Sequence, residues 1–228
     1  MADDIRPPIP LSCAHRPVAG GLVAPFVNAR LADGGVDFRT PHTARYEECL
    51  RFGLCQTCGG PLGPRPVFFG GPNQLRSRHF DEPPLCPPCA DYASRACPMV
   101  AGRTERYATA QRVSDGKRGR VCALEEGCDC AGWVKTNPDA QDHGGDPAHA
   151  WYALYVRAGA WRVAGSYITC NCGDKACRSK RFALNGALLT SPPLKVVLVS
   201  APGEGRTWRT LTAAEVAVLM PEPAEVPS

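Results

Sequence analysis

Cysteine content and spacing constrain the fold of this chain more than any other feature. The sequence has 13 cysteines among 228 residues, and four of them form two Cys-x-x-Cys pairs, Cys55 with Cys58 and Cys86 with Cys89. Two residues between thiolates let both sulfurs of a turn reach one ion, and four thiolates complete the tetrahedron that zinc accepts. We therefore predict a metal site at these four residues. The alternative, four buried core thiols, is weaker because packing alone seldom places two pairs at ligand spacing.

The segment around the two pairs has the order of elements found in a treble clef. Gly59 follows the second cysteine, where a zinc knuckle needs a tight backbone, and 66–71 has strand character. A helix is predicted from Pro87, because proline suits the first helical position, and the last two cysteines then lie in its first turn. The order of knuckle, hairpin and helix predicts a treble-clef-like zinc module over 41–118, which ends in a basic linker.

Two further cysteines belong to predicted helices rather than to ligand pairs. A helix is predicted from Pro41, with Thr40 as its cap and Gly53 at its end. Cys49 lies on the apolar face of this helix, and Cys97 lies on the apolar face of the helix that begins at Pro87. Cysteine behaves as a small hydrophobe in such positions. We therefore assign both residues to the core.

A second cluster of cysteines lies further along the chain. Its predicted ligands are Cys122, Cys128, Cys130, Cys170, Cys172 and Cys177. Either one ion takes four of these thiolates, with Cys130 or Cys128 as the fourth ligand, or two ions share all six. The whole chain would then hold two or three zinc ions. His143 and His149 are possible additional ligands, and the alternative is a set of reduced, half-buried thiols.

Two other observations on the metal-binding residues leave alternatives open. Cys13 and His15 are separated by one residue, which is a weaker ligand signal than a Cys-x-x-Cys pair. Thiolate sets do not by themselves distinguish zinc from an iron–sulfur cluster, so such a cluster is the alternative cofactor.

The remaining pattern predicts a small, loop-rich α+β protein. Gly and Pro contribute 23 residues each, so helices should be short. Residues 1–40 are predicted to be an N-terminal arm with a short strand, and 119–220 a second metal-binding module built on a β-hairpin. The hairpin strands are predicted at 151–156 and 161–169, a third strand at 194–200, and a C-terminal helix at 212–220 with a capping box. Residues 221–228 are predicted to be a disordered tail.

Charge and hydropathy bear on partners and location. The net charge is +4, and basic residues cluster in the linker and beside the second cysteine motif. The residues predicted to contact nucleic acid are Arg112, Lys117, Arg118, Arg120, Lys175, Arg178, Lys180 and Arg181. A solvated face is the alternative for these charges. The acidic start and the lack of any apolar run of roughly 18 to 20 residues predict a soluble, cytoplasmic protein with no membrane span and with reduced thiols.

Several short motifs resemble known families. The segment 85–89 resembles the Leu-Cys-x-x-Cys-His ending of HNH nucleases, but Ala90 replaces the final His and no Asp-His-x-x-Pro segment precedes it. That resemblance implies the treble-clef scaffold without the nuclease chemistry. The segment 170–178 resembles the zinc knuckle that follows SET methyltransferase domains, which implies metal binding without methyl transfer. The spacing of Cys58, Cys86, Cys89 and Cys97 is also similar to that of the WhiB-like iron–sulfur regulators.

A broader resemblance covers the N-terminal half. The segments 13–25, 55–62 and 82–102 are similar to those of uncharacterised cysteine-rich proteins of actinobacteria and their phages. The resemblance extends over about 13–107 and, more loosely, over the hairpin from Trp151. It implies a bacterial or phage cytoplasmic setting and supplies no activity.

These patterns predict a zinc-stabilised cytoplasmic binding protein that contacts nucleic acid in a regulatory role. The chain has no phosphate loop, dinucleotide fingerprint or nucleophile–base pair, and four-thiolate sites are closed, which favours a binding module over an enzyme. One alternative is a protein-interaction factor with its Pro-rich ends as contact arms. The others are an iron–sulfur redox regulator and a divergent HNH-like nuclease that would use His79, Asp81 and Glu82.

Overall fold

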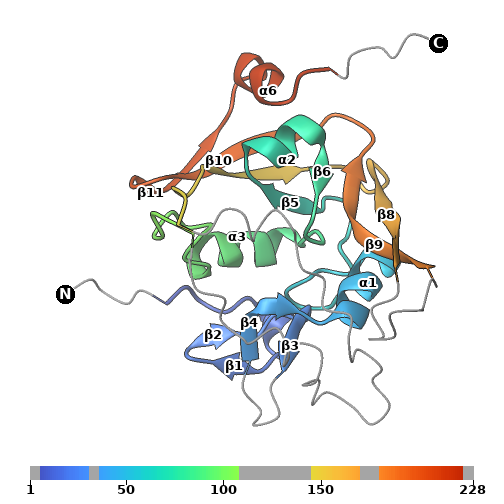
Figure 1. Cartoon of the computed structure of the whole chain (residues 1–228). Coiled ribbons are helices and arrows are strands. Elements are labelled where there is room, and N and C mark those ends of the chain that lie inside the picture. Colours follow the sequence, from blue (N-terminus) through green and yellow to red (C-terminus); the bar gives the residue numbers. More distant parts are fainter. Residues whose placement is uncertain (1–5, 31–35, 108–144, 170–179, 223–228) are drawn as a thin grey trace.

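A computed structural model describes residues 6–30, 36–107, 145–169 and 180–222 (Figure 1). The described part is a small α+β fold with several antiparallel sheets, as the sequence predicts. Its N-terminal elements are short, namely η1 (Leu11–Cys13), β1 (Val18–Ala19), β2 (Leu22–Val23), β3 (Asn28–Arg30) and β4 (Val36–Pro41). β1 pairs with β2 and β3 pairs with β4, so the region predicted to hold one short strand holds two small hairpins.

The first helix begins slightly later than the sequence predicts. α1 spans Thr43–Phe52 because Pro41 is still the last residue of β4 and is paired with Asn28. His42 therefore replaces Thr40 as the cap, and its ring accepts a hydrogen bond from the backbone N–H of Arg45. The helix ends at Gly53 as predicted, with a left-handed φ of 62° that glycine adopts without steric cost.

A four-stranded sheet forms the centre of the molecule. It contains β5 (Val67–Gly70), β7 (Trp151–Tyr155), β10 (Lys195–Ala201) and β11 (Gly205–Thr210), in the order β11-β10-β7-β5. Both faces of β5 are buried: Val67 and Phe69 pack into one hydrophobic cluster and Phe68 into another. A strand from the first predicted module thus lies in a sheet whose other strands come from the second.

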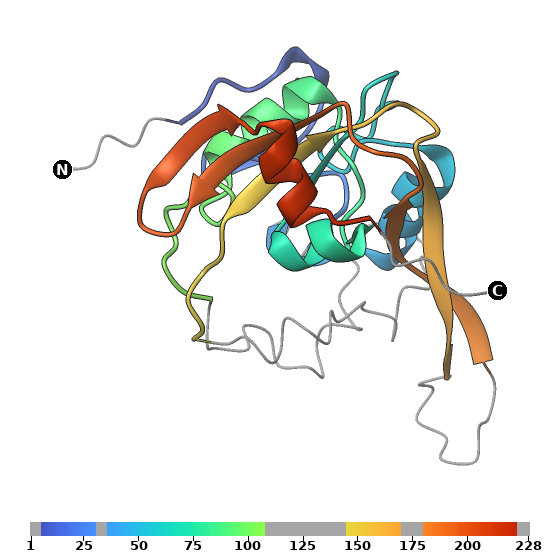
Figure 2. The same ribbon diagram turned by 90° about the horizontal axis from the view of Figure 1, so that it is seen from above.

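The predicted hairpin between 151–156 and 161–169 is wrong. β7 is flanked by β5 on one edge and β10 on the other, so neither edge is free to pair with the next strand. β8 (Trp161–Thr169) instead pairs with β9 (Lys180–Leu189), which also pairs with β6 (His79–Phe80). The resulting sheet has the order β6-β9-β8. We name the β8–β9 pair the ribbon, and it extends away from the rest of the molecule (Figure 2).

Three other helices complete the described part. They are α2 (Pro72–Ser77), α3 (Pro87–Ala96) and α6 (Ala213–Leu219). The predicted capping box at α6 is confirmed, since Thr212 accepts from the Glu215 backbone N–H and the Glu215 side chain accepts from the Thr212 N–H. α3 lies beneath the four-stranded sheet in the view of Figure 1. Among the described residues, none of the helices combines the length and apolar character needed to cross a membrane.

The hairpin expected between the two cysteine pairs is absent, so a treble clef is not confirmed. β5 and β6 are separated by α2, and they pair with β7 and β9 rather than with each other. β5 keeps one contact of the expected kind, an isolated antiparallel bridge between Val67 and Leu85. β5 and β6 nevertheless contribute to the same hydrophobic cluster, where the tilted rings of Phe68 and Phe80 have centroids 5.2 Å apart.

Candidate metal centre

The first two cysteines lie in a tight turn closed by backbone hydrogen bonds. The Cys55 N–H donates to the Gly60 carbonyl and the Gly59 N–H donates to the Cys55 carbonyl, both at 2.8 Å. Gly59 has a φ of 78°, and a Cβ there would lie 2.8 Å from the Phe26 ring, so only glycine fits. The Gly60 N–H also donates to the Cys58 sulfur at 3.4 Å. The turn thus aims both sulfurs inward, as the sequence predicts for a knuckle.

The other two cysteines lie at the start of α3. Cys86 is the N-cap, Pro87 and Pro88 occupy the first two helical positions, and Cys89 follows in the first turn. Proline is tolerated at these positions because their N–H groups have no partner within the helix. The helix N-terminus carries partial positive charge, which favours thiolates. The placement of both cysteines in the first turn of a helix agrees with the sequence prediction.

The sulfur atoms of the two Cys-x-x-Cys pairs form one compact cluster. Cys55, Cys58, Cys86 and Cys89 have sulfur atoms within 4.8 Å of one another, and Cys58 and Cys86 are 4.0 Å apart. A zinc–sulfur bond of about 2.3 Å in a tetrahedron gives sulfur–sulfur distances of about 3.8 Å. None of the four residues is more than 9% exposed. The residues therefore form a tetrad that could coordinate a metal ion such as zinc.

The protonation of the tetrad shows why a cation suits it. Hydrogen bonds from Cys55 and Cys86 lower the pKa of Cys58, and a hydrogen bond from Cys55 lowers the pKa of Cys86 to about 7. The pKa of Cys55 is raised in turn, because it donates to Cys58. Four thiolates this close repel one another in a buried site. A divalent cation supplies the charge that lets all four ionise.

A fifth cysteine reaches the tetrad from the N-terminal arm. The Cys13 sulfur lies 3.5 Å from the Cys89 sulfur, and Cys13 is only 1% exposed. The His15 Nε2 atom lies 3.0 Å from the Cys58 carbonyl oxygen, so this imidazole contacts the knuckle backbone and not the sulfurs. Their sequence spacing gave only a weak signal, because the contact depends on η1 packing against α3. The sequence pattern thus gave only weak support for a thiol that the structure places next to the tetrad.

The two cysteines assigned to the core are not among the four clustered sulfurs. Cys49 is 0% exposed on α1, and burial raises its pKa to about 12. Burial likewise raises the pKa of Cys97, which follows α3. Both thiols therefore stay protonated at neutral pH, as expected for cysteines that pack as small apolar side chains.

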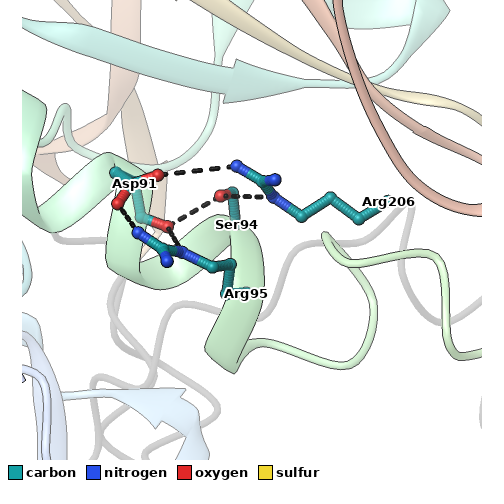
Figure 3. A network of polar contacts seen from close by, with 4 residues as sticks. All are labelled: Asp91, Ser94, Arg95 and Arg206. Atoms are coloured by element: carbon teal, nitrogen blue, oxygen red, sulfur yellow. Dashed lines mark hydrogen bonds and ion pairs between the residues drawn. The ribbon is translucent and has the colours of Figure 1, made fainter. Parts of the chain in front are cut away.

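A polar network fixes the far side of α3 to the central sheet (Figure 3). Asp91 forms an ion pair with Arg95 on the same helix and with Arg206 on β11, the latter at 3.5 Å. Arg206 also donates to the Ser94 hydroxyl at 3.3 Å, and its guanidinium lies 4.6 Å from the centre of the Trp208 ring. The helix that supplies two candidate ligands is thus held in place from both its N-terminus and its middle.

The second predicted cluster lies outside the described residues. So do its possible ligand His143, residues 223–228 of the predicted tail at 221–228, and the basic residues Arg112, Lys117, Arg118, Arg120, Lys175 and Arg178. Cys170, Cys172 and Cys177 come from the connection between β8 and β9. Lys180 and Arg181 are the first two residues of β9, where they pair with Thr169 and Ile168.

The histidines considered for other roles have side-chain partners. The His79 ring lies 3.6 Å from an Asp81 carboxylate oxygen through Nδ1 and 3.4 Å from the Asn185 side chain through Nε2. Glu82, the third member of the nuclease alternative, accepts from Gln56 at 3.4 Å. His149 contacts the Tyr107 hydroxyl and stacks on Trp151 at 5.4 Å. These contacts position the side chains within the fold.

The chemistry of the tetrad is that of a closed site. Four protein sulfurs fill a tetrahedral coordination shell, so no position is left for water or substrate, and a metal held there stabilises the fold. Protein-family models, curated proteins and solved structures give no match to this chain.

Proposed function

We propose that this chain is a zinc-stabilised, cytoplasmic nucleic-acid-binding protein with a regulatory role. The proposal of zinc is supported by the four buried sulfurs of Cys55, Cys58, Cys86 and Cys89, because zinc accepts four thiolates in a tetrahedron. A closed, buried site favours a structural metal over a catalytic one. Binding of a partner would then depend on surface residues. The surface feature that carries the proposal is the ribbon.

The ribbon and its connection concentrate the positive charge of the molecule. Between Trp161 and Leu189 the sequence has five Lys or Arg residues and one Asp, a net charge of +4. The whole chain also has a net charge of +4, so the rest of the sequence is balanced. A projecting, cationic strand pair can approach a phosphate backbone, where neutralised phosphates release counterions and drive binding.

Salt-dependent binding tests this proposal. Fluorescence anisotropy with labelled DNA and RNA oligonucleotides should show affinity for the wild-type protein that falls linearly with salt on logarithmic axes. The double variant Lys180→Glu, Arg181→Glu should lower the slope by roughly 2, since each phosphate contact contributes about 0.9. The matched control is Arg65→Glu, Arg76→Glu, which reverses two exposed charges that are not part of either ribbon strand and should leave the slope unchanged.

Two results would contradict the proposal. Absence of any salt-dependent binding by metal-loaded protein would exclude nucleic acid as the partner. Equal losses in the ribbon and control variants would show that net charge, and not the ribbon, determines binding. Copurification of one defined protein, unaffected by nuclease treatment, would favour the protein-interaction alternative.

A further inference from the structure

The outer part of the ribbon exposes a pair of aromatic rings. Tyr167 on β8 is directly opposite Phe182 on β9, and their rings meet edge to face with centroids 5.3 Å apart. Tyr167 is 73% exposed and Phe182 is 49% exposed. They are among the most exposed large apolar side chains of the described residues, and they lie together.

The strand pattern explains why the rings are exposed. Leu184 lies two residues after Phe182 on β9 and therefore on the same face of the strand, and it is buried in a hydrophobic cluster. Val163 and Trp161, on the matching face of β8, pack against the same cluster. The face that is core at the base of the ribbon continues outward beyond the body of the molecule (Figure 2). Aromatic residues at this position contribute little to the core and are available to a partner.

We propose that Tyr167 and Phe182 form a stacking surface for unpaired bases of single-stranded nucleic acid. This inference rests on the proposed nucleic-acid binding and specifies the form of nucleic acid. Every base has a flat π face that can stack on an aromatic ring, and this face is accessible only when the base is unpaired. Stacking on one ring strengthens binding by roughly ten- to a hundredfold per base.

Charge complementarity selects a nucleic acid over other occupants of the ribbon. Lys180 and Arg181 directly precede Phe182 on β9, and Arg162 on β8 is exposed near the base of the ribbon. Neither ribbon strand contains Asp or Glu. A second copy of the chain would bring the same cationic strands together, and like charges in close contact disfavour that arrangement. A phosphate backbone supplies the opposite charge beside the bases that stack.

The experiment compares a labelled single strand with the matching duplex, in both DNA and RNA forms, on the metal-loaded full chain. Wild-type protein should bind the single strand at least tenfold more tightly than the duplex at the same salt concentration. Tyr167→Ala and Phe182→Ala should each reduce single-strand affinity about tenfold and leave duplex binding unchanged. Tyr167→Phe keeps the ring and should retain affinity. The matched control is Phe52→Ala, which removes an equally exposed ring (70%) on α1.

The outcomes separate this inference from the proposed function. If wild-type protein binds no nucleic acid, the proposed function fails and the stacking surface fails with it. If wild-type protein binds, but prefers the duplex or is unaffected by Tyr167→Ala, only the stacking inference is overturned. Sedimentation without nucleic acid adds a further test: a dimer abolished by Phe182→Ala would show that a second copy covers this face. The comparison of single-stranded with duplex nucleic acid uses only wild-type protein, so it tests the inference even if a variant fails to fold.

Discussion

The sulfur tetrad and the ribbon use the same kinds of side chain in opposite ways. Around the tetrad, aromatic and cysteine side chains are buried: Tyr92 is only 4% exposed, and its hydroxyl accepts a hydrogen bond from the Val23 N–H. On the ribbon, Tyr167 and Phe182 point to solvent, next to positions that carry positive charge. Our proposal therefore divides the molecule into a scaffold that a metal ion held by the tetrad would stabilise and a projecting strand pair that would bind the partner.

The largest expected effect is loss of the metal ion. Structural zinc contributes an apparent binding free energy of about 10–16 kcal/mol in small zinc-finger peptides, which equals or exceeds the stability of a typical domain. Treatment with a strong chelator, or Cys55→Ser, should therefore abolish cooperative unfolding by urea, measured by circular dichroism. The control Cys97→Ala removes a half-buried thiol outside the tetrad and should cost about 1 kcal/mol. Unfolding at the same urea concentration with and without chelator would contradict a stabilising metal.

The next effect compares two phenylalanines. Phe68 is 1% exposed and packs against Phe80 and Trp161, so Phe68→Ala should reduce the free energy of unfolding by about 3–5 kcal/mol. Phe182 is 49% exposed, and Phe182→Ala should cost about 1 kcal/mol or less, the contribution of its contact with Tyr167. Urea unfolding measures both. Similar losses of unfolding free energy in the two variants would mean that the ribbon is part of the stabilising core, which would contradict the division between scaffold and ribbon.

A smaller effect concerns the fifth thiol. Cys13→Ala removes the group that lies 3.5 Å from the Cys89 sulfur, which should cost about 1 kcal/mol and accelerate release of zinc to a chromophoric chelator. Cys13→Ser keeps a donor at that position and should restore the slow release. Metal content should stay the same in both variants, because a tetrahedral ion is already satisfied by four sulfurs. Loss of an ion in Cys13→Ser would instead identify Cys13 as a ligand.

The smallest effect belongs to the network that joins α3 to β11. The Asp91 and Arg206 side chains are 44% and 32% exposed, and ion pairs at such positions contribute roughly 0–1 kcal/mol. Asp91→Asn should therefore lower the free energy of unfolding by at most about 1 kcal/mol, and less at high salt. Glu47→Gln, which breaks an i,i+4 pair with Arg51 on α1, is the matched control. A loss of metal from Asp91→Asn would show that this network positions the cysteine helix.

Local features of the fold could be predicted from the sequence. The Cys-x-x-Cys spacing predicted the tetrad because two residues between cysteines are enough to bring both sulfurs of one turn to the same ion. The helix from Pro87 and the capping box at Thr212 were predicted for the same reason, since caps and proline positions act within one turn. The end of α1 at Gly53 is a further local signal that the structure confirms.

Long-range pairing could not be predicted in this way. The sequence predicts that β7 forms a hairpin with the next strand, but β5 and β10 occupy both of its edges in the folded chain. β9 lacked a clear strand signal because Gly186 interrupts it, and this glycine is needed where a Cβ would lie 2.2 Å from the Phe80 carbonyl oxygen. The contact between Cys13 and Cys89 likewise spans 76 residues and exists only in the folded chain.

The most direct test of the account is the metal content of the full chain, purified without added metal and under low oxygen, together with its visible spectrum. We expect zinc in the wild-type protein, one ion fewer in Cys86→Ser, and no visible absorption. Unchanged zinc content in Cys86→Ser would show that the tetrad is not a zinc site. Iron with sulfide and a brown chromophore lost in Cys86→Ser would replace the structural zinc with an iron–sulfur cluster.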